Sequence, residues 1–499
     1  MTNPLAPEWL IEPSDANEIA PAVWPRNSGR DDSGELAIGG VPASVLAAEY
    51  GTPLYVVDEQ DVRSRALSAR EAFDREFARV GSSAKVYYAA KAFLSTEIAR
   101  WVTEAGLYID VCSGGELAVA LAAGVDASRL GFHGNNKSLA EIDRAVRVGI
   151  GVIVIDSEIE IQRVADAAAR HSRTQQVRLR LNSGVHAQTH EYLATAHEDQ
   201  KFGVTIAEAP AMVAAIRATG TLEFLGLHSH IGSQIFESDA FVEAARRLLN
   251  LQVELLDGGP VPELNLGGGF GIAYTTVDEA LPLETVAARF GDIVSDECAR
   301  LGIAVPLVAV EPGRSIVGPS TVTLYEVGTI KDVTVSVPST VPEPGRPSST
   351  DSPVPEPGRP RPTAEGAEGA TAIRKYVSVD GGMSDNIRPA LYGADYTVRI
   401  AGRWSGAAPA LVRVAGKHCE SGDIVVRSDY LPGDVQPGDL LAVAATGAYC
   451  WALSNNYNYL GRPPVVAVSA GVARIIVRGE TEADLLSRDA GIRSPGTDN

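Results

Sequence analysis

Short apolar runs alternate with longer Ala-, Arg- and Glu-rich segments through the first two thirds of the chain. Each run has the length of a buried strand, and each spacer is typical of a helix. Eight such units predict a (β/α)8 barrel of the TIM type, an α/β fold with a closed parallel sheet. A doubly wound open sheet is the alternative, but the units carry no dinucleotide-binding fingerprint. The predicted strands span 86–90, 107–111, 130–133, 151–155, 177–181, 224–230, 264–266 and 307–310.

Polar residues follow these strands at the end where barrel enzymes carry out their chemistry. So many polar groups at equivalent positions are not expected from core packing, and they predict a functional site there. In chain order they are Lys91, Asp110, His133, Asp156, Asn182, His230, a glycine-rich loop at 267–271 and the segment 311–314.

Beyond residue 315 the pattern changes to short strands separated by turns, which is typical of a mostly β domain, a sandwich or a barrel. We expect the parallel barrel at 54–315 and a β domain made of residues 36–53 together with 316–499. Residues 1–35 are rich in Pro, Asn, Asp and Ser and are expected to form an extended or disordered arm. The predicted β strands span 322–327, 374–379, 411–414, 423–426, 439–444 and 465–472.

A tract rich in Pro, Gly, Ser and Glu interrupts the β domain at 338–370 and contains Val-Pro-Glu-Pro-Gly-Arg-Pro twice. This composition cannot bury enough apolar surface to fold by itself. We expect a disordered surface insertion between two neighbouring strands of one sheet, because the entropy cost of a loop grows slowly with its length.

Composition narrows the possible partners. A hydrophobic content of 45% and a charged content of 21% are ordinary for a globular protein. The net charge of −20 disfavours nucleic acid and anionic membranes as partners. With no apolar leader or membrane-length run, we expect a cytoplasmic protein. Four scattered cysteines are too few for a disulfide framework, so we expect free, buried thiols.

Lys91 follows the run Val-Tyr-Tyr-Ala-Ala at the end of the first predicted barrel strand. A lysine at the edge of a hydrophobic interior is costly to keep charged, and a neutral amine can attack a carbonyl carbon. Lys91 is therefore a candidate Schiff-base lysine. The alternative is a lysine that only extends its amine into water, as most lysines at strand ends do.

Two segments at the ends of the seventh and eighth barrel strands have the composition of an anion site. Residues 265–271 read Asn-Leu-Gly-Gly-Gly-Phe-Gly, and bare glycines let backbone N–H groups converge on a phosphate; a tight turn is the alternative. Residues 311–314 read Glu-Pro-Gly-Arg and offer a carboxylate for a heteroaromatic nitrogen and an arginine for a carboxylate or phosphate. The tetrapeptide recurs at 343–346 and 356–359, but only the first copy follows a buried strand.

Histidines close the sixth barrel strand. We expect that His228 and His230 do not line the same pocket, with His230 stacking on a flat ring and His228 a hydrogen-bonded structural residue. Ser233, just beyond, is placed to donate to a phosphate. Three other histidines lie in a polar segment without a thiolate or a defined helix, so we predict no metal site there. They are His186, His190 and His197.

Cys419 lies in the β domain between a lysine, a histidine and the sequence Glu-Ser-Gly-Asp. Positive neighbours favour a thiol that exchanges protons. From the spacing alone, however, we expect a buried thiol, with a proton donor as the alternative.

Together these motifs resemble those of the diaminopimelate decarboxylase family, pyridoxal-phosphate enzymes built from an alanine-racemase-like barrel and a β domain. The resemblance runs from about residue 23 to 486, fails only across the Pro-rich tract, and is similar in wording to the actinobacterial branch. The motifs are Tyr-Ala-Ala-Lys-Ala at 88–92, His-Gly-Asn-Asn-Lys-Ser at 133–138, His-Ile-Gly-Ser-Gln at 230–234, Asp-Gly-Gly-Met at 380–383, Arg-Pro-Ala-Leu-Tyr at 388–392 and Cys-Glu-Ser-Gly-Asp at 419–423.

The resemblance implies a role for each matched residue. It makes Lys91 the Schiff-base lysine of pyridoxal 5'-phosphate, His230 the residue stacked on its ring, and Glu311 the holder of its ring-nitrogen proton. Cys419 becomes the general acid, donated together with Glu420 by the other subunit of a homodimer. The other implied cofactor contacts are Ser233, Gly268, Gly269, Pro312, Gly313, Arg314 and Tyr449. The implied substrate contacts are Arg314, Arg388, Tyr392, Glu420 and Tyr449.

The reaction that the resemblance implies is decarboxylation of meso-2,6-diaminoheptanedioate to L-lysine and carbon dioxide, the last step of L-lysine biosynthesis. Two alternatives stay open. An ornithine- or arginine-type decarboxylase on the same fold calls for a carboxylate at the distal end of the substrate, where this chain offers Arg314 and Arg388. A non-catalytic pyridoxal-phosphate-binding homologue has no need of Cys419.

Overall fold

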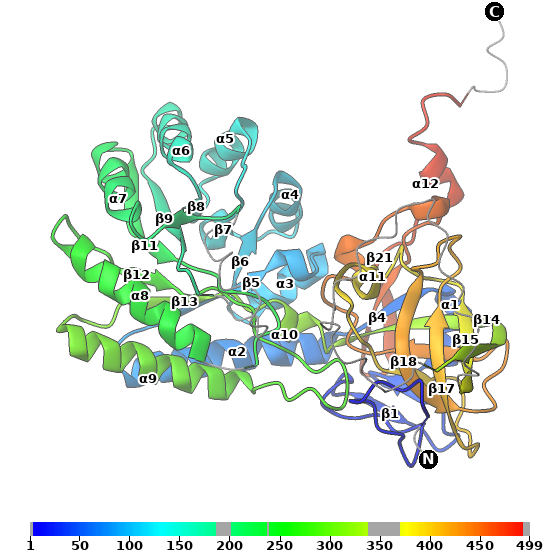
Figure 1. Cartoon of the computed structure of the whole chain (residues 1–499). Helices are drawn as coiled ribbons and strands as arrows, with labels where there is room; N and C mark the ends of the chain where they lie inside the picture. Colours follow the sequence, from blue (N-terminus) through cyan, green and yellow to red (C-terminus); the bar gives the residue numbers. More distant parts are fainter. Residues whose placement is uncertain (1–2, 186–200, 237–238, 338–369, 493–499) are drawn as a thin grey trace, which may run out of the picture.

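The computed structural model describes residues 3–185, 201–236, 239–337 and 370–492, which form a parallel barrel unit and a mostly β unit (Figure 1). Nearly all of the predicted insertion at 338–370 lies outside these residues. So do the three histidines for which no metal site is predicted. Among the described helices, none combines the length and the apolar character needed to cross a membrane.

Eight parallel strands close the barrel, because the pairing of the fourth strand with the fifth completes the ring. Ile153 pairs with Val177 at this closure. The predicted (β/α)8 barrel is confirmed, and an open doubly wound sheet is excluded. The strands, in chain order, are β5 (Ala84–Ala89), β6 (Tyr108–Val111), β7 (Leu130–Phe132), β8 (Val152–Ile155), β9 (Gln175–Asn182), β11 (Leu222–His228), β12 (Glu263–Asn265) and β13 (Leu307–Val310), with β10 (Val204–Thr205) added beside β9.

Helices surround the ring of strands and cover its apolar outer side (Figure 1). Ser95, Ser113 and Ser138 each accept a backbone N–H in the first turn of the helix that follows. Such caps let a helix begin soon after a strand, so the strand ends stay close to the barrel axis. The helices are α2 (Glu59–Arg79), α3 (Thr96–Glu104), α4 (Gly114–Ala122), α5 (Leu139–Val148), α6 (Glu158–Arg170), α7 (Ala209–Ala218), α8 (Asp239–Leu256) and α9 (Leu283–Leu301).

The second sheet has the order β18-β17-β15-β14-β4-β20-β21, and β19 joins β14 to β16. Strands β14 and β15 pair antiparallel from Val327 with Val379 to Ser336 with Thr371, so the flanks of the Pro-rich tract are neighbours, as predicted. The strands are β4 (Leu54–Asp58), β14 (Thr321–Ser336), β15 (Thr371–Val379), β16 (Val398–Ile400), β17 (Pro409–Ala415), β18 (Ile424–Pro432), β19 (Leu440–Val443), β20 (Val465–Ser469) and β21 (Val472–Val477). The short helices are α10 (Arg314–Val317), α11 (Arg388–Tyr392) and α12 (Glu482–Leu486).

Two expectations about this unit are wrong. Strand β4 pairs with β14 and β20, so it belongs to the second sheet and not to a barrel beginning at residue 54. A fully buried apolar strand has the same sequence pattern in either sheet, because the pattern does not name the partner strand. The single strand predicted at 465–472 is two strands, which turn at Ala470 and Gly471, both with positive φ.

The N-terminal arm is ordered over residues 3–35, so of the two expected states, extended or disordered, disorder is wrong for this part. Val23 and Trp24 are fully buried. Asn17 Nδ2 donates to the Ser405 carbonyl oxygen at 2.8 Å, and the Ser405 N–H donates to Asn17 Oδ1 at 3.1 Å. The isolated apolar residues that dock on the β unit are too few to give a periodic pattern. The arm leads into β1 (Ser28–Arg30), β2 (Leu36–Ile38), β3 (Val41–Pro42) and α1 (Ala43–Tyr50).

Candidate active site

A cavity lies at the carboxyl ends of the barrel strands and consists of two adjoining hollows. The outer hollow has a volume of about 850 Å³ and is lined by the barrel, the β unit and the N-terminal arm. The inner hollow, about 480 Å³, is lined within the barrel. Both walls contain Ala89, Lys91, His230 and Glu311. The polar strand ends predicted from the sequence therefore do converge, although Asp156 and Asn182 line a separate, neighbouring hollow.

Lys91 projects into this cavity from the turn η1 (Ala90–Ala92), directly after β5. Its two neighbours in the turn are buried, whereas the lysine side chain is exposed to the cavity. The Ala89 backbone N–H donates to the carbonyl oxygen of Pro312 at 3.1 Å, which ties the end of β5 to the residue beyond β13. The placement of Lys91 at a strand end agrees with the sequence.

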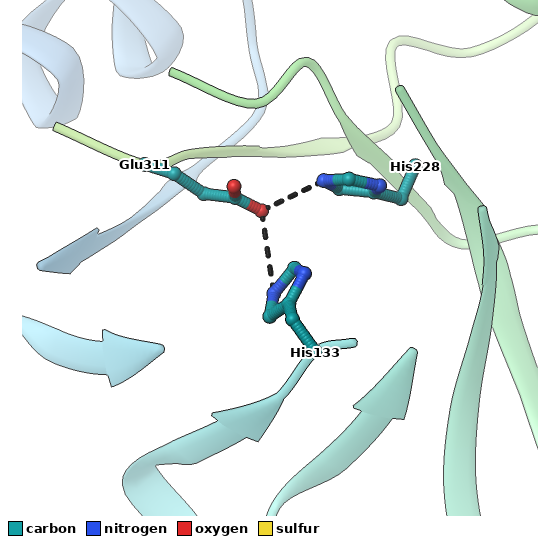
Figure 2. Close-up of side chains that lie close together, drawn as sticks. All are labelled: His133, His228 and Glu311. Atoms are coloured by element: carbon teal, nitrogen blue, oxygen red, sulfur yellow. Dashed lines mark ion pairs between the residues drawn. The ribbon is translucent and has the colours of Figure 1, made fainter. Parts of the chain in front are cut away.

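Glu311 is the centre of a buried polar cluster in the inner hollow (Figure 2). Its Oε1 lies 3.0 Å from His228 Nε2 and 3.5 Å from His133 Nε2, and accepts a hydrogen bond from Asn265 Nδ2 at 2.8 Å. His133 Nε2 also lies 3.1 Å from Asp110 Oδ1. The second Glu311 oxygen, Oε2, takes part in none of these contacts. One ligand atom each of His133, His228 and Glu311 lies within 4.8 Å of the other two, a spacing that is also compatible with a metal ion.

The two carboxyl groups of the inner hollow are driven toward opposite protonation states. Burial opposes charge on Glu311, but the facing His228 and His133 outweigh burial and hold the pKa of Glu311 well below its usual range. Burial lowers the pKa of His228 to about 4, so at neutral pH a neutral imidazole faces the carboxylate. Burial raises the pKa of Asp110. Groups whose environments separate their pKa values in this way are typical of catalytic sites.

His228 and His230 both line the inner hollow, so the expectation that only one of them does is wrong. Residues two positions apart on a strand point to the same side, and β11 ends at His228. Desolvation and the nearby charge of Lys91 lower the pKa of His230 well below its usual range. Its Nδ1 accepts a hydrogen bond from the Gly268 N–H at 3.3 Å, so the ring is held against the glycine-rich loop.

The glycine-rich loop is packed too tightly for side chains. A Cβ on Gly268 would lie 2.1 Å from the Glu311 carbonyl oxygen, and one on Gly269, where φ is +100°, would lie 2.2 Å from the Gly232 carbonyl oxygen. Only glycine tolerates such approach. Gly269 and Gly313 line the outer hollow, whereas Gly268 and Pro312 belong to neither wall.

Arg314 begins α10 directly behind this loop and is buried, with 8% of its surface exposed. Its Nη2 donates to Ser233 Oγ at 2.7 Å, and its Nη1 donates to the Tyr274 hydroxyl. The guanidinium carbon lies 4.7 Å from the centre of the Tyr449 ring. Ser233, Arg314 and Tyr449 are thus brought together at the outer hollow, as the sequence predicts.

Arg388 reaches the same hollow from α11 of the β unit. Its Nη1 donates to the Tyr396 hydroxyl at 2.5 Å, and its guanidinium carbon lies 4.7 Å from the centre of the Tyr274 ring. Tyr392, in the same short helix, also lines the hollow and is 66% exposed. Sequence reasoning identified Arg388 and Tyr392 but missed Tyr274, Tyr396 and the arm residue Trp9, which also lines the hollow. No periodic pattern or motif marks these aromatic residues.

Cys419 and Glu420 are exposed and, of the residues that the structure describes, contribute to neither hollow. The expected burial of the Cys419 thiol is therefore wrong. The neighbouring His418 does not face the thiol, because its Nδ1 lies 2.9 Å from Asp423 Oδ2 and its ring stacks on Tyr457. Of the other cysteines, Cys112 is also exposed, whereas Cys298 and Cys450 are buried.

Comparison with known proteins identifies the chain. Residues 59–318 match the pyridoxal-binding domain of pyridoxal-dependent decarboxylases, and residues 349–447 match the C-terminal sheet domain of the same enzymes. Fold and site therefore define a pyridoxal-dependent decarboxylase. The chain belongs to the diaminopimelate decarboxylase family, as its relatives establish.

The diaminopimelate decarboxylase of Mycobacterium tuberculosis (strain ATCC 25618 / H37Rv) is 51% identical over 477 residues, which cover 94% of this chain and 98% of the relative. The diaminopimelate decarboxylase of Bacillus subtilis (strain 168) is 41% identical over 466 residues, which cover 93% of this chain and 97% of that relative. Among solved structures, diaminopimelate decarboxylase from M. jannaschii in co-complex with L-lysine superposes with a TM-score of 0.80 at 30% identity, over 94% of this chain and 98% of that one.

The cavity fits the pyridoxal phosphate that this family uses. The bare glycine loop, Ser233 and Arg314 offer a site for its phosphate. His228 Nδ1 and Arg314 Nε have no hydrogen-bond partner among the described residues although both are buried. Buried polar atoms are rarely left unpaired, so these two indicate a polar ligand. Lys91, exposed to the cavity, offers a primary amine there.

Proposed function

We propose that the chain decarboxylates meso-2,6-diaminoheptanedioate to L-lysine and carbon dioxide, and that it acts in the cytoplasm. The observation that carries the substrate assignment is the pair of arginines, Arg314 and Arg388, which both contact Tyr274 at the outer hollow. Guanidinium groups bind carboxylates with paired hydrogen bonds. The pair therefore suits a substrate that keeps a second carboxylate at its far end, as diaminoheptanedioate does.

Lys91 and Glu311 form the reactive end of the proposed site. Bound pyridoxal phosphate supplies an electron-withdrawing protonated ring that takes up the electron pair left by departing carbon dioxide. Lys91 would hold the cofactor through its Nζ. Glu311 stays ionised because His228, His133 and Asn265 all meet its Oε1. Its carboxylate would then keep the cofactor's ring nitrogen protonated.

His230 and Ser233 orient the cofactor in this proposal. The His230 ring stands against the glycine loop through its contact with Gly268, a position suited to stacking on a flat ring. Ser233 and Arg314 are hydrogen-bonded to one another at 2.7 Å and offer donors to a phosphate. Tyr449 is fixed by the bond of its N–H to the Ala92 carbonyl oxygen, at 2.8 Å, and faces the same space.

A homodimer with shared sites is the second part of the proposal. Cys419 is exposed and contributes to neither hollow of its own chain. Large apolar residues around the cavity mouth and the Cys419 loop are exposed, at 66% for Tyr392 and 74% for Tyr459. Asn458, next to Tyr459, accepts the Cys419 N–H at 3.1 Å. A second copy of the chain covers this surface and brings Cys419, with Glu420, to the open site, where the thiol protonates the α carbon.

Carbon dioxide release from three substrates tests the reaction. Purified protein with added pyridoxal phosphate should release carbon dioxide from meso-diaminopimelate and not from L-ornithine or L-arginine. Release from ornithine or arginine instead would assign the chain to the basic amino-acid decarboxylases. If none of the three substrates released carbon dioxide while the cofactor absorption band was normal, the chain would be a non-catalytic pyridoxal-phosphate-binding protein.

The Arg388→Ala variant tests the carboxylate clamp. We expect activity on diaminopimelate to fall at least about a hundredfold while cofactor absorbance is retained, because a charge-assisted bidentate contact is lost. Arg413→Ala is a matched control, since this arginine donates to the Arg427 backbone, lies over the Tyr376 ring in the β unit and lines neither hollow. Unchanged activity of Arg388→Ala would overturn the substrate assignment.

Mixing two inactive variants tests the shared site. In a mixture of Lys91→Ala and Cys419→Ala subunits, each mixed dimer has one site with an intact lysine and an intact thiol. Random exchange should restore about a quarter of wild-type activity. Mixing Lys91→Ala with Glu311→Gln, two residues of the same subunit's wall, should restore none. Equal failure of both mixtures would mean that Cys419 acts within its own chain.

A further inference from the structure

Tyr274 touches both arginines of the outer hollow. Its hydroxyl accepts a hydrogen bond from Arg314 Nη1, and its ring face lies 4.7 Å from the guanidinium carbon of Arg388. Arg314 comes from α10 of the barrel unit, and Arg388 comes from α11 of the β unit. One side chain thus connects two cations that come from different units of the chain.

Contacts from three neighbouring residues hold Tyr274 in position. The residue is buried, and its ring meets the Tyr396 ring edge to face at 5.2 Å. Its backbone N–H donates to Asp278 Oδ2 at 2.9 Å, and its carbonyl oxygen accepts from Thr397 Oγ1 of the β unit, also at 2.9 Å. Tyr396 in turn accepts a hydrogen bond from Arg388 Nη1. Tyr274 is therefore part of the junction between the two units.

Two guanidinium groups that share one hollow repel each other unless something holds them. The negative face of an aromatic ring attracts one cation, and the phenolic oxygen accepts a hydrogen bond from the other. Among the described residues, loss of the ring would leave the Arg388 guanidinium with Tyr396, and that of Arg314 with Ser233 and the Tyr449 ring. The spacing between the two arginines would then no longer be fixed.

We propose that Tyr274 is a positioning residue that sets the spacing of Arg314 and Arg388 and thereby the preference for a substrate with a second carboxylate. The inference rests on the proposed function, because it assumes that the two arginines bind the retained carboxylate. Tyr274 touches no reacting atom in this account. It acts only through the arginines.

Two ligands that differ by one carboxylate test this role. L-lysine keeps the retained carboxylate, whereas 1,5-diaminopentane has the same chain and amines without it. We measure the dissociation constant of each for the holoenzyme by calorimetry. Tyr274→Leu removes both ring and hydroxyl and should weaken L-lysine binding by about 30-fold, whereas Tyr274→Phe, which keeps the ring, should weaken it by about fivefold. Binding of the diamine should change less than about twofold in both variants.

Tyr87→Phe is the matched control. Tyr87 is also a buried tyrosine whose hydroxyl accepts from an arginine, Arg178, at 3.1 Å, and whose ring lies 5.1 Å from that guanidinium carbon. It lines neither hollow. This variant should leave both dissociation constants unchanged.

Equal weakening of both ligands by Tyr274→Leu would mean a general structural role and would overturn the proposal. Unchanged binding of L-lysine would overturn it as well. The proposed function would fail in a different way, if the wild-type protein released no carbon dioxide from diaminopimelate. That result does not depend on how the two variants bind L-lysine.

Discussion

The inner and outer hollows form one cavity, yet they are built in different ways. All described residues that line the inner hollow come from the barrel, and His133 and His228 meet Glu311 there. The outer hollow takes its wall from the barrel, the β unit and the N-terminal arm. There Arg314 and Arg388 are held by aromatic rings, among them that of Tyr274.

This difference separates the two tasks of the site. Groups fixed by neighbouring strands of one sheet cannot move relative to one another without disturbing the barrel, which suits the chemical step. Groups contributed by separate segments can change without loss of the barrel, which suits recognition of the far end of a substrate. Changes in the inner hollow should therefore lower kcat, and changes in the outer hollow should raise KM.

The largest effect is expected for Glu311→Gln. The amide keeps the size of the side chain and its contact with Asn265 but removes the charge that holds a proton on the ring nitrogen. We expect kcat to fall about 10²- to 10³-fold with KM within about threefold, as for the loss of a preorganised electrostatic group. Steady-state kinetics on diaminopimelate, with the cofactor content measured by absorbance, provide the check.

Glu263→Gln is the control for this variant. Glu263 is another buried barrel carboxylate, paired with Arg178 at 2.7 Å and with Lys85 at 2.5 Å, and it lines neither hollow. Its loss should lower stability and leave kcat within about twofold, because the pair lies outside the cavity. If Glu311→Gln changed KM and not kcat, the division of tasks between the hollows would be wrong.

A second prediction concerns pH and the burial of His228. Its pKa is about 4 in the folded protein and about 6.5 in an unfolded chain. Between these values the unfolded chain binds a proton that the folded chain excludes, so stability falls as the pH decreases from 6.5 to 4. At pH 5 the loss from this residue is about 2 kcal/mol relative to pH 7.

The variant His228→Gln isolates this effect. An amide can still donate to Glu311 and does not titrate, while the carboxyl groups of Asp110 and Glu311 are present in both proteins. Urea unfolding at pH 7 and pH 5 should therefore show a smaller loss of stability for the variant than for the wild type. His171→Gln, which changes a partly exposed histidine beside Asp143, serves as the control. Equal losses in wild type and His228→Gln would mean that the barrel tolerates a charged His228.

The inner hollow could be predicted from the sequence because its groups follow successive strands. Lys91, His133 and Glu311 stand at equivalent positions in a repeating unit, and parallel strands bring their carboxyl ends together. The sequence analysis was wrong about His228 and His230, which face the same hollow. The partner of strand β4 failed for a similar reason, since an apolar strand pattern does not reveal which sheet it joins.

In the outer hollow, Ser233 and Arg314 were predicted from their places beyond barrel strands, and the residues of the β unit only where a family motif marked them. Arg388 and Tyr392 came from the resemblance, whereas Tyr274 and Tyr396 are aromatic residues without a distinguishing pattern. Their positions depend on how two units pack together, and hydrophobic periodicity carries no information about that. Trp9 was missed because its place in the hollow wall also depends on how the N-terminal arm packs.

The smallest effect is expected for Trp9→Ala, which tests whether the arm belongs to the outer hollow. Trp9 is half-buried in the hollow wall, and the arm is held by the bond of Arg399 Nε to the Glu18 carbonyl oxygen at 2.7 Å. Loss of one partly exposed aromatic wall should raise KM for diaminopimelate about two- to fourfold and leave kcat unchanged. Trp9→Phe should restore most of the difference, and Trp404→Ala, at a tryptophan that is 54% exposed and outside both hollows, should have no effect. A fall in kcat would mean that the arm acts on the inner hollow as well, and the separation of the two regions would then not hold.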